Sequence, residues 1–517
     1  MISRKGIHNF KSIIGSHKTA HMKTKLLFLG FVVCFLSAPA HSQTSPEPGE
    51  ASRELLLRVH DPAESIIADL KSFIPEYIRT ERIPGVSVAL VYDNKIAWTQ
   101  GFGFANSITK EPVDTNSLFE IASVSKVVTA YIALRLVDEG KLSLSKPLHS
   151  YLPEEWMPYS AYRDSIKLGH VLSHSSGLRK TGREIMFEPG TAYLYSANGL
   201  NLLQDVIEEV TGESLEELAQ RLVFQPLGMK NSSFVLVDEL LPYAANGHIH
   251  ATVAVGLFGL LLLANYLIIL LIGLLINRLV TRSWKLRRSH FIILILLSVA
   301  VVAGVLLYVL GKSSIIEFAY LTLLAGLISL VLFFILYYPA RLMILRLVDK
   351  KGWQRVLSAL CGLLFIVILI LASLKITNLP VPSWPAYEAR SPGTIRCSPG
   401  ELALFMIEMA NPRLLKSETA ELLRTPQIKL DENLSWGMGP GIYYSDDGYA
   451  LWQWGQHVDF QTIMIVYPES GFGIVVCTNN DLLNPDVALE IAQAALGGDI
   501  ETIRAAIHLS YDYSEEE

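Results

Sequence analysis

The most pronounced pattern in this chain is a central block of four long apolar stretches separated by charged loops. The stretches at residues 251–276, 291–311, 318–340 and 356–374 contain no Asp, Glu, Lys or Arg. A helix needs about 20 mostly apolar residues to cross the hydrocarbon core of a bilayer, and each stretch has about this length. The pattern therefore predicts four transmembrane helices within residues 251–376.

The loops between these stretches indicate how the chain is oriented. Loops rich in lysine and arginine tend to stay on the cytoplasmic side, and the first and third loops are of this kind. An even number of crossings returns the chain to the side that it left, so we expect both flanking parts to be extracytoplasmic. No charged residue lies within a span, and we interpret the helices as an anchor rather than a transport pathway. The basic residues are Arg278, Arg282, Lys285, Arg287 and Arg288 in the first loop, and Arg341, Arg346, Lys350, Lys351 and Arg355 in the third.

The N-terminal pattern also predicts export. Residues 22–25 carry two lysines, residues 26–36 are apolar, and residues 37–42 are mostly small, which is the order of zones in a secretory signal. We assign residues 1–43 to this signal region. An uncleaved anchor is the alternative, and it would leave the following domain on the same side of the membrane.

The polar parts of the chain alternate between helical and strand patterns. Residues 54–79 have helical apolar spacing, and residues 86–92 and 96–104 are strand-like with Asp93-Asn94 at the turn between them. A long helix with an apolar face begins near Ser123, and Gly140 is placed to end it. Mixed helices and strands of this kind indicate an α+β domain.

Composition narrows the class of protein. The 517 residues suffice for about three domain-sized units, and the net charge of −6 comes without a sustained basic run in the polar parts. This argues against nucleic-acid binding. The polar parts contain two cysteines, Cys397 and Cys477, without metal-type spacing, and a disulfide between them stays open.

Candidate chemistry centres on Ser123 and Lys126. Residues three apart at the start of a helix share one face, so the amine can lie beside the hydroxyl. A buried lysine loses part of its preference for the charged form and can then accept the serine proton. The same spacing occurs at 107/110 and 143/146, but Pro112 and Pro147 disfavour helix at those two places.

Several motifs follow in order along the chain: "GKLSLSKPLHSYLP", "VLSHSSGL", "FEPGTAYLYSANGLNLLQDVIEEVTGES" and "FQPLGMKNSSF". Together with Ser-x-x-Lys, they resemble the serine β-lactamase and penicillin-binding protein superfamily, in its class C-related branch. The resemblance implies an antiparallel sheet flanked by helices plus a helical subdomain. The domain would be split into residues 44–250 and 391–517 by the membrane insertion 251–376 and a proline-rich linker 377–390.

The resemblance also implies roles for single residues. Ser123 corresponds to the acylated nucleophile, Lys126 to its base, and Tyr195 to the tyrosine that moves protons to and from the leaving group. The alternative to this proton-transfer role is that Tyr195 is an ordinary packed tyrosine. Where the family has an asparagine two residues later, this chain has Ala197 followed by Asn198, which puts the positioning of amide substrates in doubt. His174 corresponds to a structural residue of a turn, and we leave it out of the catalytic set.

The third family motif is the most altered. Its best counterpart is Gln453-Trp454-Gly455, in which only the glycine is retained. The backbone N–H groups of Ser123 and Gln456 would form the oxyanion hole, and Asn198, Gln453, Trp454 and Gly455 would contact substrate. The alternative that Trp454 is only a packed residue on an edge strand stays open. The resemblance implies no metal and no cofactor.

We therefore expect a membrane-tethered, multi-pass, extracytoplasmic serine hydrolase that acts through an acyl-enzyme on an ester or amide and is a poor β-lactamase. Its substrate would be a small molecule or a peptide. In one form of this hypothesis, that substrate is derived from the cell wall. One alternative is a D-alanyl peptide or penicillin-binding cell-wall hydrolase. Another is a binding or sensor protein that keeps the fold with weak catalysis.

Overall fold

The computed structural model describes residues 57–153, 162–180, 184–249, 379–381, 383, 385–446, 448–480, 484–498 and 501–512. The predicted signal region and the four predicted membrane spans lie outside these residues. Within the described ranges, no helix is both long and apolar enough to cross a membrane. The prediction of four transmembrane helices therefore stays a prediction.

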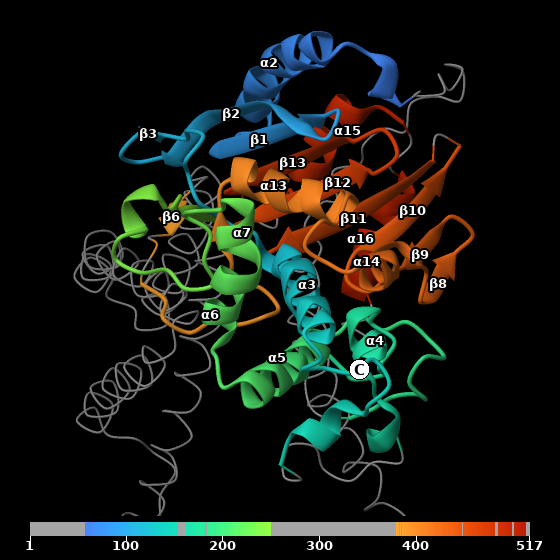
Figure 1. The fold of residues 1–517 in the computed structure, drawn as a ribbon. Coiled ribbons are helices and arrows are strands. Elements are labelled where there is room, and N and C mark those ends of the chain that lie inside the picture. The colour runs from blue at the N-terminus through green and yellow to red at the C-terminus, as the bar shows by residue number, and fades with distance from the viewer. Residues whose placement is uncertain are drawn as a thin grey trace, which may run out of the picture. The chain divides into compact units, whose positions relative to one another are not determined.

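The described strands form one nine-stranded antiparallel sheet and two short ladders (Figure 1). The short ladders pair β4 (Phe119–Glu120) with β7 (Arg396–Cys397), and β5 (Gly247–Ile249) with β6 (Leu379–Val381). In spatial order the nine strands are β3 (Glu111–Pro112), β2 (Lys95–Asn106), β1 (Gly85–Tyr92), β13 (Phe472–Thr478), β12 (Gln461–Tyr467), β11 (Gly448–Gln456), β10 (Gly441–Ser445), β9 (Leu434–Trp436) and β8 (Ile428–Asp431).

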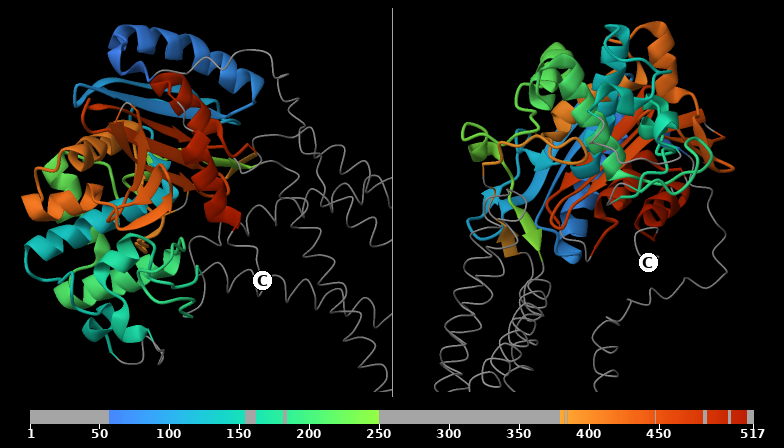
Figure 2. Two further views of the ribbon diagram at one scale, coloured as in Figure 1. Left: turned by 90° about the vertical axis from the view of Figure 1, so that its right-hand side faces the viewer. Right: turned by 90° about the horizontal axis from the view of Figure 1, so that it is seen from below.

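Helices cover both faces of the large sheet, as Figures 1 and 2 show. Successive strand residues point to opposite faces, so an all-apolar strand supplies two cores at once. On β1, Ala89 and Val91 belong to one core and Val88 and Leu90 to the other. The continuous apolar run of this strand follows from burial on both sides.

The helices divide between these two cores. The face that carries Val88 packs against α2 (Ala63–Thr80), α15 (Val487–Leu496) and α16 (Glu501–Asp512). The opposite face packs against the nucleophile helix and its neighbours. That second layer contains α3 (Ser125–Asp138), α4 (Leu168–Leu172), α5 (Ala197–Thr211), α6 (Leu215–Ala219), α7 (Gln225–Leu227), α13 (Pro399–Ala410) and α14 (Ser417–Arg424).

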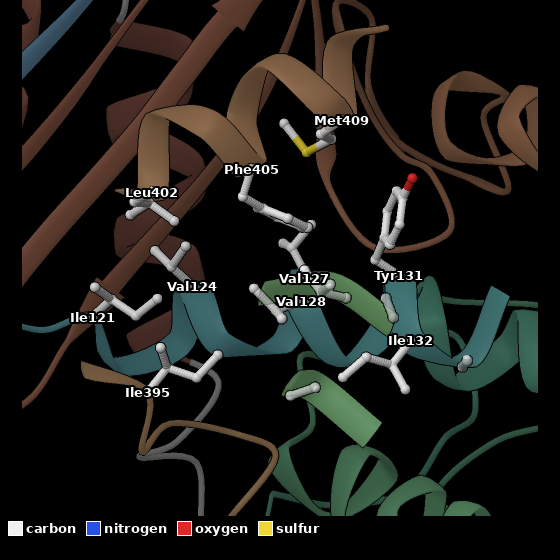
Figure 3. Packing of buried hydrophobic residues seen from close by; sticks show 14 of the residues in the cluster. Ile121, Val124, Val127, Val128, Tyr131, Ile132, Ile395, Leu402, Phe405 and Met409 are labelled. Atoms are coloured by element: carbon white, nitrogen blue, oxygen red, sulfur yellow. The ribbon is translucent and has the colours of Figure 1, made fainter. Parts of the chain in front are cut away.

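Helix α3 lies at the centre of the second layer. Eleven of its residues are buried, so it is apolar nearly all round rather than amphipathic. Figure 3 shows Val124, Val127 and Tyr131 facing Leu402 and Phe405 of α13. Truncating a buried phenylalanine in such a core costs about 3–5 kcal/mol. The nucleophile helix is thus held rigidly by its packing.

Several local predictions are confirmed, and one boundary is wrong. Asp93 and Asn94 both have positive φ, as a two-residue hairpin turn requires, and Gly140 has φ +73° just after α3. The helix expected over residues 54–79 begins only at Ala63. Pro62 disfavours helical backbone at Asp61, which is extended, so the described residues 57–61 contain a separate short helix, η1 (Arg58–His60).

The two parts of the chain on either side of the predicted insertion form one domain. Strand β1 pairs with β13 over six residue pairs, so a late strand joins the N-terminal hairpin in one sheet. Residues Gly247 and Ile249 pair with Val381 and Leu379 in the β5–β6 ladder. The chain therefore leaves and re-enters the domain at adjacent positions, and such closely spaced ends make a long insertion tolerable.

Candidate active site

Ser123 lies in a strained turn just before α3. The short helix η2 (Ala122–Val124) joins β4 to α3, and Ser123 is its middle, half-buried residue. Ala122 has φ +46°, a conformation that costs a non-glycine residue roughly 1–3 kcal/mol. Such backbone persists only where the surrounding structure fixes it. The turn presents the hydroxyl at the head of a rigid helix.

The structure brings Ser123 and Lys126 together as the spacing predicts. The Nζ of Lys126 donates to Ser123 Oγ at 2.6 Å and to the carbonyl oxygen of Pro392 at 2.8 Å. Burial, and secondarily the charge of exposed Lys180, lowers the pKa of Lys126 to about 7. A large fraction of this amine is therefore neutral near pH 7 and able to accept a proton from the hydroxyl.

The segment that follows the insertion completes this site. Besides the Pro392 carbonyl, Ile395 N–H donates to Ser125 Oγ at 3.2 Å, and Ile121 N–H donates to Ile395 O at 3.0 Å. These bonds join residues about 270 positions apart in the sequence. The nucleophile turn is thus built from both parts of the split domain.

Tyr195 lies beside Lys126. The Nζ of Lys126 is 5.1 Å from the centre of the Tyr195 ring, and the imidazole of His174 is 4.3 Å from it on another side. His174 accepts a hydrogen bond from Ser196 N–H at 3.2 Å. Burial and the nearby Lys126 charge hold the pKa of His174 well below its usual range, so it stays neutral. This supports a structural role for His174.

Gln453 and Trp454 contact Tyr195 from β11. Gln453 is fully buried, and its Nε2 donates to the Tyr195 hydroxyl at 3.3 Å and to the Trp454 carbonyl at 2.9 Å. The indole of Trp454 is 5.0 Å from the Tyr195 ring between centroids and is almost fully buried. A neutral amide therefore occupies the position where the family resemblance implies a cation.

The end of β11 runs beside the nucleophile turn. Strand β10 pairs with β11 only as far as Trp452 among the described residues, and beyond it Gly455 lies against Ser123. A Cβ added at Gly455 would clash with the Ile121 carbonyl and lie 2.9 Å from Ser123 N. Only glycine permits this approach. The assignment of the Gln456 N–H to the oxyanion hole stays a prediction.

The remaining candidates are placed as follows. Asn198 lies in the first turn of α5, three residues after Tyr195, and a substrate contact for it stays a prediction. The other two Ser-x-x-Lys pairs lie in turns and irregular segments, as expected, and the Lys146 amine sits over the Tyr151 ring instead.

Two charged residues near the nucleophile, Glu120 and Arg396, were not singled out from the sequence, and their contacts with each other and with His457 were not expected. Glu120, on β4, accepts a hydrogen bond from Arg396 Nη2 at 2.7 Å and bonds through its other oxygen to His457 Nδ1. Burial opposes the charged form of Glu120, but Arg396 and His457 outweigh it and lower the pKa of Glu120 to about 2. The available sequence signal was a single arginine in the otherwise uncharged run 391–400.

The arrangement is suited to nucleophilic catalysis. It can offer Ser123 as a nucleophile, Lys126 as a base with a pKa near neutrality, and Tyr195 as a second group able to carry a proton. In the part of the chain that the structure describes, no group of three or more His, Cys, Asp or Glu side chains could hold a metal ion.

Comparison with known proteins agrees with this geometry. Residues 70–259 match the family model "Beta-lactamase". The chain is 28% identical over 211 residues to Esterase EstB of Burkholderia gladioli and 29% identical over 191 residues to a β-lactamase of Pseudomonas fluorescens. Each match covers 34% of this chain and 53% of the relative, so the chain spans about half the length of these curated relatives.

Two solved structures share the fold. One is the octameric penicillin-binding protein homologue from Pyrococcus abyssi, with a TM-score of 0.53 and 18% identity over 83% of this chain and 76% of the other. The second is the D-alanine carboxypeptidase AmpC from Burkholderia cenocepacia, with a TM-score of 0.52 and 14% identity over 84% and 99%. Motif order, fold and the match over residues 70–259 together show that this domain is homologous to the β-lactamase family of serine hydrolases.

Proposed function

We propose that this protein is a serine hydrolase that cleaves an ester or amide through an acyl-enzyme on Ser123. The observation that carries the proposal is the 2.6 Å contact between Ser123 Oγ and the buried Lys126 amine, whose pKa is about 7. The neutral amine takes the hydroxyl proton while Oγ forms a bond to the substrate carbonyl carbon. The leaving group departs with a proton supplied through Tyr195 or Lys126, and water then hydrolyses the acyl-enzyme.

We further propose a preference for substrates without a carboxylate beside the scissile bond. Gln453 is neutral and already bonded to Tyr195, and the His457 imidazole is paired with Glu120. A missing charge-assisted hydrogen bond lowers transition-state binding by about 1.5–3 kcal/mol, or roughly ten- to a hundredfold. Relatives that carry the names esterase and β-lactamase are both similar to this chain, so the substrate has to be measured.

Labelling with a fluorophosphonate probe tests the proposed nucleophile. The wild-type protein should be labelled on Ser123, and Ser123→Ala should not be labelled. Ser143→Ala should behave as wild type, because Ser143 lies in an irregular segment outside the site and its hydroxyl contacts Ser145. Labelling that persists in Ser123→Ala would contradict the proposal. Substrate preference is tested with a short-chain p-nitrophenyl ester and a chromogenic cephalosporin, and a higher kcat/KM for the cephalosporin would contradict the preference.

We also propose that the hydrolase domain is tethered to a membrane with the active site on the extracytoplasmic side. The support is the sequence pattern of residues 251–376 and the adjacent ends of the chain in the β5–β6 ladder. In intact cells, cysteines placed at positions 285 and 350 should be protected from an impermeant thiol reagent, and cysteines placed at positions 231 and 445 should react. The reverse pattern would contradict this topology.

A further inference from the structure

The carboxylate of Glu120 connects three segments that meet around the nucleophile. Glu120 lies three residues before Ser123, and its register partner on β7 is Arg396. One carboxylate oxygen accepts from Arg396 Nη2 at 2.7 Å, and the second bonds to His457 Nδ1. His457 follows directly after β11, whose last residues lie beside Ser123. Both oxygens of this half-buried carboxylate are thus committed to other segments.

The nucleophile turn requires such restraints. Ala122, between Glu120 and Ser123, has φ +46° and relaxes unless its neighbours are fixed. Gly455 approaches Ser123 N closely enough that no side chain fits between the strand and the turn. A small shift of either element would therefore change the separation of the two backbone N–H groups expected to bind the oxyanion.

His457 also touches the segment that holds the catalytic lysine. A Cβ added at Gly393 would lie 3.0 Å from His457 Nε2, so the imidazole packs directly against this glycine. The preceding residue, Pro392, supplies the carbonyl that accepts from Lys126 Nζ. The Glu120 and His457 pair therefore borders the nucleophile turn, the β11 end and the lysine's partner segment.

We propose that Glu120, acting through His457 and Arg396, is a positioning residue that holds the nucleophile turn against the end of β11 and so sets the geometry of acylation. This inference rests on the proposed serine hydrolase function. Glu120 touches neither the reacting hydroxyl nor the expected substrate position, so its removal should slow acylation and leave the first binding step unchanged. The other charged groups around it are Asp459, which is buried, and Lys126.

The test compares Glu120→Gln, His457→Ala and the double variant in rapid-mixing assays with a p-nitrophenyl ester. Each single variant should lower the acylation rate constant at least about tenfold while the dissociation constant of the first complex changes less than about twofold. The double variant should be no slower than the slower single variant, because both changes break the same link. His457→Asn, which can place an amide N–H near the position of Nδ1, should recover part of the rate.

A matched control separates positioning from general stability. Glu408→Gln removes a fully buried carboxylate that lies outside the nucleophile turn and accepts a hydrogen bond of 2.6 Å from the Tyr131 hydroxyl. It should lower the melting temperature and leave the acylation rate of folded protein unchanged. Melting curves fix the folded fraction of every variant at the assay temperature.

The outcomes distinguish a failure of the positioning role of Glu120 from a failure of the proposed hydrolase function. Equal acylation rates in wild type and Glu120→Gln, or additive losses in the double variant, would overturn the positioning role and leave the hydrolase function intact. A loss in Glu120→Gln that appears only in the dissociation constant would overturn it as well. A wild-type protein that is not labelled at Ser123 would overturn both.

Discussion

The amine of Lys126 lies 2.6 Å from the hydroxyl of Ser123, and burial together with Lys180 lowers the pKa of that amine to about 7. The reactive form is the neutral amine, because only it can accept the hydroxyl proton. Below pH 7 the fraction of neutral amine falls tenfold for each pH unit.

The acylation rate should therefore rise with pH, with a slope near one in a logarithmic plot below about pH 7, and level off above it. The measurement is the second-order rate constant for fluorophosphonate labelling between about pH 5 and 9. Lys180→Gln removes the second positive charge and should move the midpoint upwards. A rate that is flat across this range would argue against Lys126 as the base.

Gly455→Ala tests the close approach of β11 to the nucleophile. The added methyl group would lie 2.9 Å from Ser123 N and would clash with the Ile121 carbonyl, so the turn or the strand must move. We expect a loss of kcat of roughly a hundredfold, since displacements of about 1 Å at a reacting group have effects of this size.

Gly400→Ala, in helix α13, is the matched control. Outside the helix's own backbone, its added methyl group would have no neighbour closer than 3.5 Å. Its kcat should stay within about twofold of wild type, and its melting temperature should not fall. Full activity in Gly455→Ala would contradict the arrangement of strand and turn described above.

Tyr195→Phe removes the hydroxyl that accepts from Gln453 Nε2 and keeps the ring packed against Trp454. If Tyr195 carries a proton to the leaving group, kcat should fall about 10²- to 10⁴-fold with little change in melting temperature. Tyr444→Phe, at a partly exposed tyrosine on β10, serves as the control with normal kcat. A normal kcat in Tyr195→Phe would mean that Tyr195 serves only in packing and does not transfer a proton.

Asp459 should make the stability of the domain depend on pH. Burial, and then the charge of Glu120, raises the pKa of Asp459 to about 7 from the ordinary value of 3.8. The folded state then keeps a proton that the unfolded state has lost between about pH 4 and 7. Stability contributed by this group falls as pH rises through that window, and the full cost is present above pH 7.

Asp459→Asn should therefore raise the melting temperature at pH 8 by about 3 °C or more and change it little at pH 4. The measurement is thermal unfolding of both proteins at the two pH values. Asp238→Asn, at an exposed aspartate, should show no such pH-dependent difference. A stabilisation of Asp459→Asn that is greater at pH 4 than at pH 8 would reverse the sign argued here.

The sequence by itself determined the features that depend on neighbouring residues. Ser123 and Lys126 are one helical turn apart, so their contact follows once α3 forms. The turn at Asp93-Asn94 and the end of α3 before Gly140 follow equally from local backbone preferences. The family resemblance added the antiparallel sheet, because the motif order is characteristic even where single motifs are weak.

Only the tertiary structure decided which distant segments meet at the nucleophile. Glu120 bonds to Arg396 and His457, which are 276 and 337 residues away, and Lys126 donates to Pro392 across 266 residues. Hydrophobic periodicity shows which face of an element is buried but does not show which partner covers it. The pairing of β5 with β6 at the ends of the insertion, and the contact of Gln453 with Tyr195, are of the same kind. These contacts arise from the packing of whole elements, so no local pattern in the sequence carries them.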